Sequence, residues 1–114
     1  MNPLPEEFLL GVELFNQGKF FECHEAWETI WLKATGVERE FLHAMIQSAA
    51  ALHHAQQGNL KGALSVGQRA IGKLATLPAE MMRVNTGEFR LSLQDFLTQT
   101  EAAFPRVELK GEYK

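Results

Sequence analysis

The sequence contains one cysteine, Cys23, so no disulfide can form within the chain. No run approaches the about 18 apolar residues of a membrane-spanning helix. The opening segment MNPLPEEFLL carries acids where a signal peptide carries basic residues. Glycine-rich phosphate loops, G-x-S-x-G elbows and C-x-x-C pairs are also missing. These absences predict a cytoplasmic protein with no membrane segment, and they exclude the most familiar catalytic signatures.

Charge of neither sign dominates, because the formal net charge is −3. Residues 1–28 hold six acids and one base, whereas residues 61–90 hold five bases and two acids. Blocks of opposite sign can face each other within a fold or between subunits, and a solvated surface is the alternative. The bases do not alternate with aromatic side chains as they do in single-strand binders. We therefore do not expect nucleic acid as a partner.

The 114 residues fit a single domain, 1–114, which is large enough to bury a core without disulfide or metal staples. The apolar positions repeat with a helical period nearly throughout, and no segment shows the alternation of a strand. Short glycine-containing connections favour antiparallel neighbours, so we predict an all-α bundle or array. The expected helices cover 5–17, 20–34, 37–57, 60–77 and 86–104, with a short packed turn at 79–87 and a loosely held tail at 105–114.

Two segments forty residues apart, 17–23 and 57–63, form a weak internal repeat. Each predicts a helix–turn–helix corner similar to those of tetratricopeptide proteins, although two copies are too few for a solenoid. Asn59 is the expected N-cap of the fourth helix, and Thr86 is the expected N-cap of the fifth.

The densest group of polar side chains lies in the second helix, where His24, Glu25 and Glu28 form an H-E-x-x-E sequence. A zinc protease helix needs H-E-x-x-H, so the second metal ligand of that motif is missing. His24 and Glu28 are still one turn apart, a spacing that lets both face one ion. Glu22 belongs to the same cluster.

The third helix offers complementary groups, because His43, Gln47 and His54 are spaced four and seven residues apart and share a face. If this helix packs antiparallel to the second, His24 and Glu28 meet these groups. We expect a small polar pocket walled by the two tryptophans. The cluster predicted to bind a ligand or to form a structural network comprises Glu22, His24, Glu25, Trp27, Glu28, Trp31, Gln47 and His54.

Two functional hypotheses remain open. In the first, the pocket binds a small molecule or a divalent metal held by His24, Glu28 and His54, and the histidine and carboxylate can serve as an acid–base pair. In the second, the cluster is purely structural, and the protein is a non-catalytic module that binds a protein partner or forms a homo-oligomer. For Trp27 and Trp31, packing is the simpler interpretation.

Residues 15–31, FNQGKFFECHEAWETIW, resemble the signature F-N-x-G-x-F-[FY]-E-x-H-E-x-x-E-x-x-W of the prokaryotic "domain of unknown function 309" family. A second block, around Gln47 and Asn59, also matches, so the resemblance covers about residues 8–77. It implies a small all-helical protein but no reaction. It places the polar motif of the family on Glu22, His24, Glu25, Glu28, Gln47 and Asn59.

Overall fold

Five helices and one small hairpin make up the part of the chain that the computed structural model describes, residues 3–99 and 103–111. The helices are α1 (Glu6–Asn16), α2 (Phe20–Trp31), α3 (Gly36–Gln56), α4 (Leu60–Leu74) and α5 (Thr86–Thr98). Between α4 and α5, β1 (Glu80–Met81) pairs antiparallel with β2 (Val84–Asn85). The predicted all-α architecture is confirmed, and the packed turn expected at 79–87 contains this hairpin.

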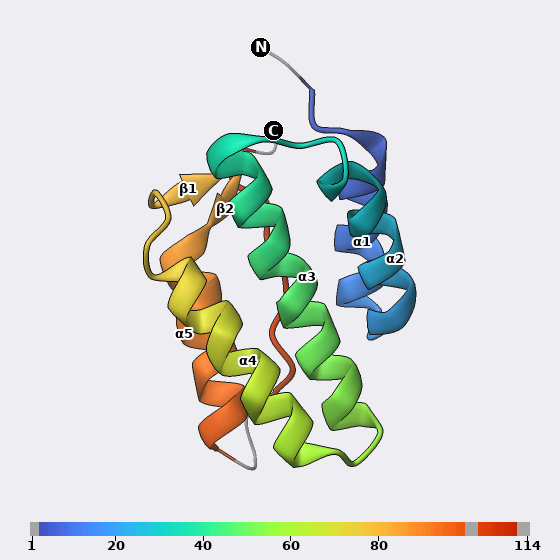
Figure 1. Ribbon diagram of the computed structural model, residues 1–114, viewed down its shortest axis with the longest axis vertical. Helices are drawn as coiled ribbons and strands as arrows, with labels where there is room; N and C mark the ends of the chain where they lie inside the picture. The colour runs from blue at the N-terminus through green and yellow to red at the C-terminus, as the bar shows by residue number, and fades with distance from the viewer. Residues whose placement is uncertain (1–2, 100–102, 112–114) are drawn as a thin grey trace.

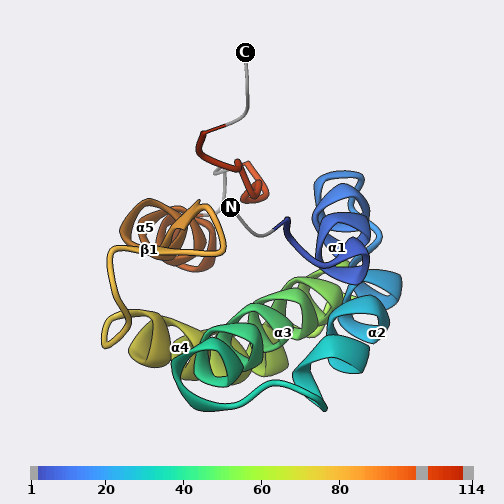
Figure 2. The ribbon, with the colours of Figure 1, turned by 90° about the horizontal axis from the view of Figure 1, so that it is seen from above.

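The helices form two layers (Figures 1 and 2). One layer holds α2, α3 and α4 side by side with α3 in the centre, and α1 and α5 lie over its two flanks. The C-terminal segment runs between α1 and α5 in the second layer. None of the described helices is long and apolar enough to cross a membrane.

Aromatic side chains fill the region where the layers meet. The Trp27 ring stacks between Phe8 and Phe15, with each pair of ring centroids 5.8 Å apart. Phe15 also lies 5.7 Å from Phe89 of α5, so the cluster links both flanking helices to α2. These side chains are almost completely buried. Burial of the apolar faces of the helices is therefore the main source of stability.

The two predicted corners have the same backbone geometry. Gly18 and Gly58 adopt φ values of 79° and 78°, a left-handed conformation that glycine accepts without strain. In each corner the glycine amide donates to the carbonyl three residues earlier, and the next amide donates to the carbonyl five residues earlier. This pair of bonds is the Schellman ending of a helix. The weak internal repeat therefore corresponds to two equivalent helix endings.

The caps were predicted with mixed success. The Asn59 side chain accepts a hydrogen bond of 2.9 Å from the Gly62 amide, which confirms it as the N-cap of α4. The prediction for Thr86 is wrong, because Asn85 caps α5 by accepting from Glu88 N. Thr86 is instead buried, and its hydroxyl donates to a backbone carbonyl.

The last helix is shorter than predicted. It ends at Thr98, whereas the sequence pattern extended it to 104, and residues 100–102 of that prediction lie outside the described residues. The ring centroids of Phe96 and Phe104 are 4.5 Å apart. In a continuous helix these positions would be separated by about 12 Å along the axis. Phe104 therefore packs against Phe96 of α5 and does not continue that helix.

The segment after α5 is packed rather than loosely held, which corrects the prediction for 105–111. Val107 is 2% exposed, and its amide and carbonyl both hydrogen-bond to the Asn16 side chain, at 2.8 and 3.0 Å. Leu109 forms an isolated β-bridge with Val84 of the hairpin. The remainder of the predicted tail, 112–114, lies outside the described residues.

Candidate functional site between α2 and α3

Two ring contacts define how α2 meets α3. At one end, the ring centroids of Phe21 and His53 are 5.6 Å apart. At the other end, the ring centroids of Trp31 and His43 are also 5.6 Å apart. The two α2 residues are ten positions apart, and so are the two α3 residues, in the reverse order. The helices therefore run antiparallel in a regular register. Gln47 lies between the two contacts along α3. We call this line of contacts the α2–α3 seam.

A small pocket opens at the Phe21 end of the seam. Its volume is about 180 Å³, and it is lined by Phe20, Phe21, His24, Ala50, His53 and His54. Three of the four histidines of the chain therefore line one cavity. Antiparallel packing of α2 and α3, as predicted, brings His24 and His54 together here.

The rings on the wall of this pocket are ordered relative to each other. The Phe21 and His24 rings are parallel within 5°, with centroids 6.5 Å apart. A second, more open hollow shares Phe20, Phe21 and His53 with the pocket and is also lined by residues of the first corner. The pocket thus lies beside a larger opening to solvent.

Three buried polar atoms along the seam have no hydrogen-bond partner within the described chain. They are His24 Nδ1, Gln47 Oε1 and Trp31 Nε1. Leaving one such atom unsatisfied costs roughly 1–3 kcal/mol. Of the three residues, only His24 lines the pocket, so its Nδ1 is the atom that a molecule in the pocket could reach.

Arg39 organises the opposite end of the seam. Its guanidinium lies 4.1 Å from the centre of the Trp31 ring, and its Nη1 donates to the carbonyls of Trp31 and Ala34 at 2.9 and 3.3 Å. These bonds satisfy the carbonyl of the last residue of α2 and a carbonyl just beyond it. The helix ends at Trp31, three residues before the predicted end at position 34. Burial, followed by the positive charge of Lys73, lowers the pKa of the neighbouring His43.

The predicted role of Glu28 is wrong in its geometry. Glu28 is exposed, and no hydrogen bond or ion pair joins it to His24 in the described structure. It lies about 40° farther round α2 than His24, because four residues exceed one helical turn. The inner face of α2 therefore ends at His24. The other two carboxylates of the cluster, Glu22 and Glu25, are exposed as well.

Trp27 is not a wall of the pocket. It is completely buried among core residues, and its Nε1 donates a hydrogen bond of 3.1 Å to the carbonyl of Phe8 in α1. The simpler expectation of packing is the one that the structure supports for this residue. Trp31 is half-buried on the seam and does contact α3 through His43.

The predicted metal ligands do not converge. Among the described residues, no group of three histidine, cysteine, aspartate or glutamate side chains is placed to hold a metal ion. His54 instead receives a hydrogen bond of 3.3 Å from the Asn59 side chain. The histidines of the pocket are thus arranged as walls and not as a three-ligand cage.

Two pocket residues were missed in the sequence. Phe21 and His53 line the pocket but are not among the site residues that the sequence predicts. The signal that could have found them is the spacing of three between Phe21 and His24, which puts both rings on one side of α2. Matching that side to the end of α3 would have added His53.

The helices and their short connections define a small all-α protein. The family described as "Domain of unknown function (DUF309)" matches residues 8–66, and the chain belongs to this family. The resemblance drawn from residues 15–31 is therefore confirmed at the level of the family.

Two relatives extend this comparison. An uncharacterized protein of Aquifex aeolicus (strain VF5) is 31% identical over 101 residues, which cover 88% of this chain and 30% of that protein. The chain thus spans about a third of the length of that relative. The crystal structure of a conserved hypothetical protein from Thermus thermophilus is similar, with a TM-score of 0.72 and 32% identity over 83% of this chain and 98% of the other. Neither description names a substrate.

Proposed function

We propose that the protein is a small-molecule-binding module and that its site is the pocket lined by His24, His53 and His54 at the α2–α3 seam. The ligand class is a planar, one-ring organic molecule with a hydrogen-bonding edge. The observation that carries the proposal is a ring-lined pocket in which the buried His24 Nδ1 has no hydrogen-bond partner within the described chain.

The size of the pocket supports a one-ring ligand. A dry apolar cavity of about 150 Å³ accommodates benzene, and the pocket volume is about 180 Å³. A larger cofactor would extend into the adjoining hollow beyond Phe21 and His53.

The lining supports a ligand that is both flat and polar. Phe20, Phe21 and Ala50 supply apolar contact, and the parallel Phe21 and His24 rings offer faces and edges for aromatic packing. An imidazole can donate or accept a hydrogen bond, depending on its tautomer. A mostly apolar cavity with a few polar groups is the usual composition of a small-molecule site.

We expect binding rather than acid–base catalysis at this site. The carboxylates that would complete a histidine–carboxylate pair, Glu25 and Glu28, are exposed and unpaired with His24 in the described structure. A general acid or base needs a reacting group within hydrogen-bond reach and a partner that orients it. The metal hypothesis is a separate proposal, and isothermal titration with zinc, manganese and iron tests it.

Proton NMR of the four histidines tests the proposal. Phenol and benzoate serve as a neutral and an anionic one-ring probe, and the imidazole Cε1 protons are followed during titration. Saturable shifts are expected for His24, His53 and His54. His43 is the internal control, because it lies at the other end of the seam, ten positions from His53. Equal shifts at all four histidines, or none, would contradict a pocket-specific ligand.

A further inference from the structure

The outer faces of α1 and α4 are opposite in charge, and both expose leucine side chains. α1 contains Glu6, Glu7 and Glu13 and no basic residue, whereas α4 contains three basic residues and no acid. Each helix also exposes two leucines, and between 41% and 67% of the surface of each leucine is accessible to solvent. These leucines are Leu9 and Leu10 on α1, and Leu60 and Leu64 on α4.

An apolar groove runs between α4 and α5. It consists of two hollows, of about 290 and about 180 Å³, that share Leu64 and Leu97. Gly67 lets the Leu97 side chain lie against the backbone of α4, because a Cβ at position 67 would overlap that side chain. The groove therefore lies where a small residue lets α5 approach the backbone of α4.

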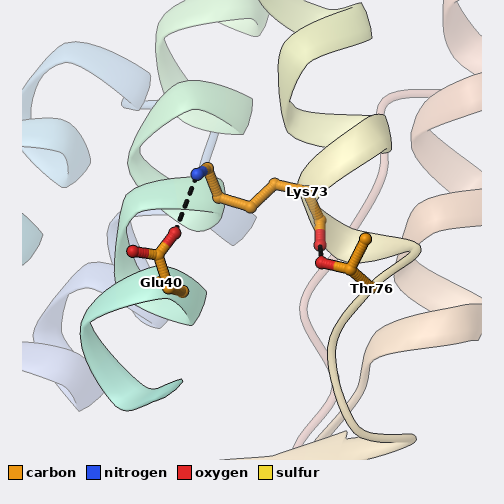
Figure 3. Close-up of polar contacts among 3 residues, drawn as sticks. All are labelled: Glu40, Lys73 and Thr76. Carbon is orange, nitrogen blue, oxygen red and sulfur yellow. Dashed lines mark hydrogen bonds and ion pairs between the residues drawn. The ribbon is translucent and has the colours of Figure 1, made fainter. Parts of the chain in front are cut away.

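Basic residues lie on both helices that form this groove. Lys61 precedes Leu64 by three residues on α4, and Arg90 precedes Leu97 by seven on α5, so each shares a helical face with a groove residue. Lys73 is not available in the same way, because it pairs with Glu40 at 2.9 Å (Figure 3).

The exposed face of α1 is the complement of this groove. Glu6, Leu9, Leu10 and Glu13 are spaced three, four and seven residues apart, so they form one stripe with the leucines between the acids. With a length of about 16 Å, α1 is shorter than α4 and can lie along it. An amphipathic helix in an apolar groove is a recurring mode of protein recognition.

The two faces do not meet within one chain. α1 packs on α2 and α4 packs on α3 and α5, so α1 and α4 lie on opposite flanks of the molecule (Figure 2). We propose that the α4–α5 groove of one copy binds the exposed face of α1 of a second copy. Leu9 and Leu10 enter the groove, and the acids of α1 face Lys61 and Arg90.

This contact joins two different surfaces, so it is heterologous and extends into rings or chains of copies. Its ionic component lies at the protein surface and weakens as salt screens the charges. It is independent of the pocket at the α2–α3 seam, so either proposal can fail without the other.

Complementary variants test the proposal by sedimentation velocity. Leu64→Glu disables the groove and leaves α1 intact, whereas Leu10→Glu disables α1 and leaves the groove intact. The wild type is expected to self-associate with increasing concentration at low ionic strength and to dissociate at high salt. Each variant alone is expected to be monomeric, and an equimolar mixture is expected to form a 1:1 complex that does not grow further.

Leu32→Glu is the matched control, because Leu32 is exposed but belongs to neither face, and it should associate as the wild type does. If circular dichroism shows that Leu64→Glu does not fold, the surface pair Lys61→Glu and Arg90→Glu replaces it, with an expected loss of roughly tenfold or more in affinity. A wild type that stays monomeric at sub-millimolar concentrations overturns the proposal. So does a mixture that stays monomeric, or a variant that still self-associates.

Discussion

The indole of Trp27 lies directly against the backbone of α1 at Gly11. Its Nε1 donates a hydrogen bond of 3.1 Å to the Phe8 carbonyl, and a Cβ at position 11 would overlap the ring. Glycine is thus required at this position for space, and the close approach lets the largest core side chain satisfy its only donor.

Gly11→Ala is therefore expected to destabilise the protein by about 1–3 kcal/mol, as overpacked cores do. This loss overrides the gain of up to about 1 kcal/mol that alanine brings to a helix interior. Gly72→Ala is the matched control, because a Cβ there meets nothing within 4 Å and should stabilise α4. Urea unfolding measures both. A Gly11→Ala protein as stable as Gly72→Ala would contradict the assigned contact.

Asn16 holds the C-terminal segment through its side chain, which bonds both backbone polar groups of Val107. Asn16→Ala leaves these buried groups unsatisfied and is expected to cost about 1–3 kcal/mol in unfolding free energy. Amide hydrogen exchange at Val107 should accelerate by more than the global loss of stability requires. Gln17→Ala, at an exposed neighbour, should change neither quantity. Unchanged protection of Val107 in Asn16→Ala would rule out the clamp.

The ion pair between Glu40 and Lys73 joins α3 to α4 (Figure 3). The hydrogen bond and charge of Lys73 lower the pKa of Glu40 from its ordinary value of 4.5. A carboxylate with a lowered pKa adds stability above its unfolded-state pKa, and this stability is lost as the pH falls through the folded-state pKa. Glu40→Gln should reduce the loss of stability on acidification below pH 4.5, with a smaller difference in high salt. Identical acid unfolding profiles would show that the pair contributes nothing.

His43 should make stability depend on pH in the neutral range. Its pKa is lowered from 6.5, first by burial and then by the positive charge of Lys73. As the pH falls, the unfolded chain therefore takes up a proton at His43 before the folded chain does. The stability that neutral His43 contributes is present above pH 6.5 and is lost as the pH falls below that value. NMR titration should give a midpoint for His43 below 6.5, and His43→Gln should flatten the pH dependence of unfolding around that pH. A midpoint at or above 6.5 would contradict the assignment.

The helices could be predicted because their apolar positions repeat locally. Gly18 and Asn59 mark a helix end and a helix start by conformational and capping preferences that act within a few residues. The hairpin gave no such signal, since its tip places Met82 and Arg83 at positive φ without glycine or asparagine.

The candidate site could be predicted only in part. Antiparallel packing of α2 on α3 correctly brought His24 near the end of α3, but the assignment of Glu28 failed because small rotations decide which side of a helix is solvated. The clamp between Asn16 and Val107 spans 91 residues, and no local pattern reveals a contact of that range. Asn16 belongs to the family signature, but the resemblance to the family implies no role for this residue.

Filling the pocket tests the central claim most directly. Ala50 lines the pocket, so Ala50→Leu occupies part of the space that a ring would take, and Ala75→Leu adds the same group at an exposed position. Isothermal titration with whichever of phenol and benzoate binds the wild type more tightly should give at least a tenfold weaker dissociation constant for Ala50→Leu. Ala75→Leu should bind as the wild type does. Equal affinity in all three proteins would place the ligand elsewhere and contradict the account.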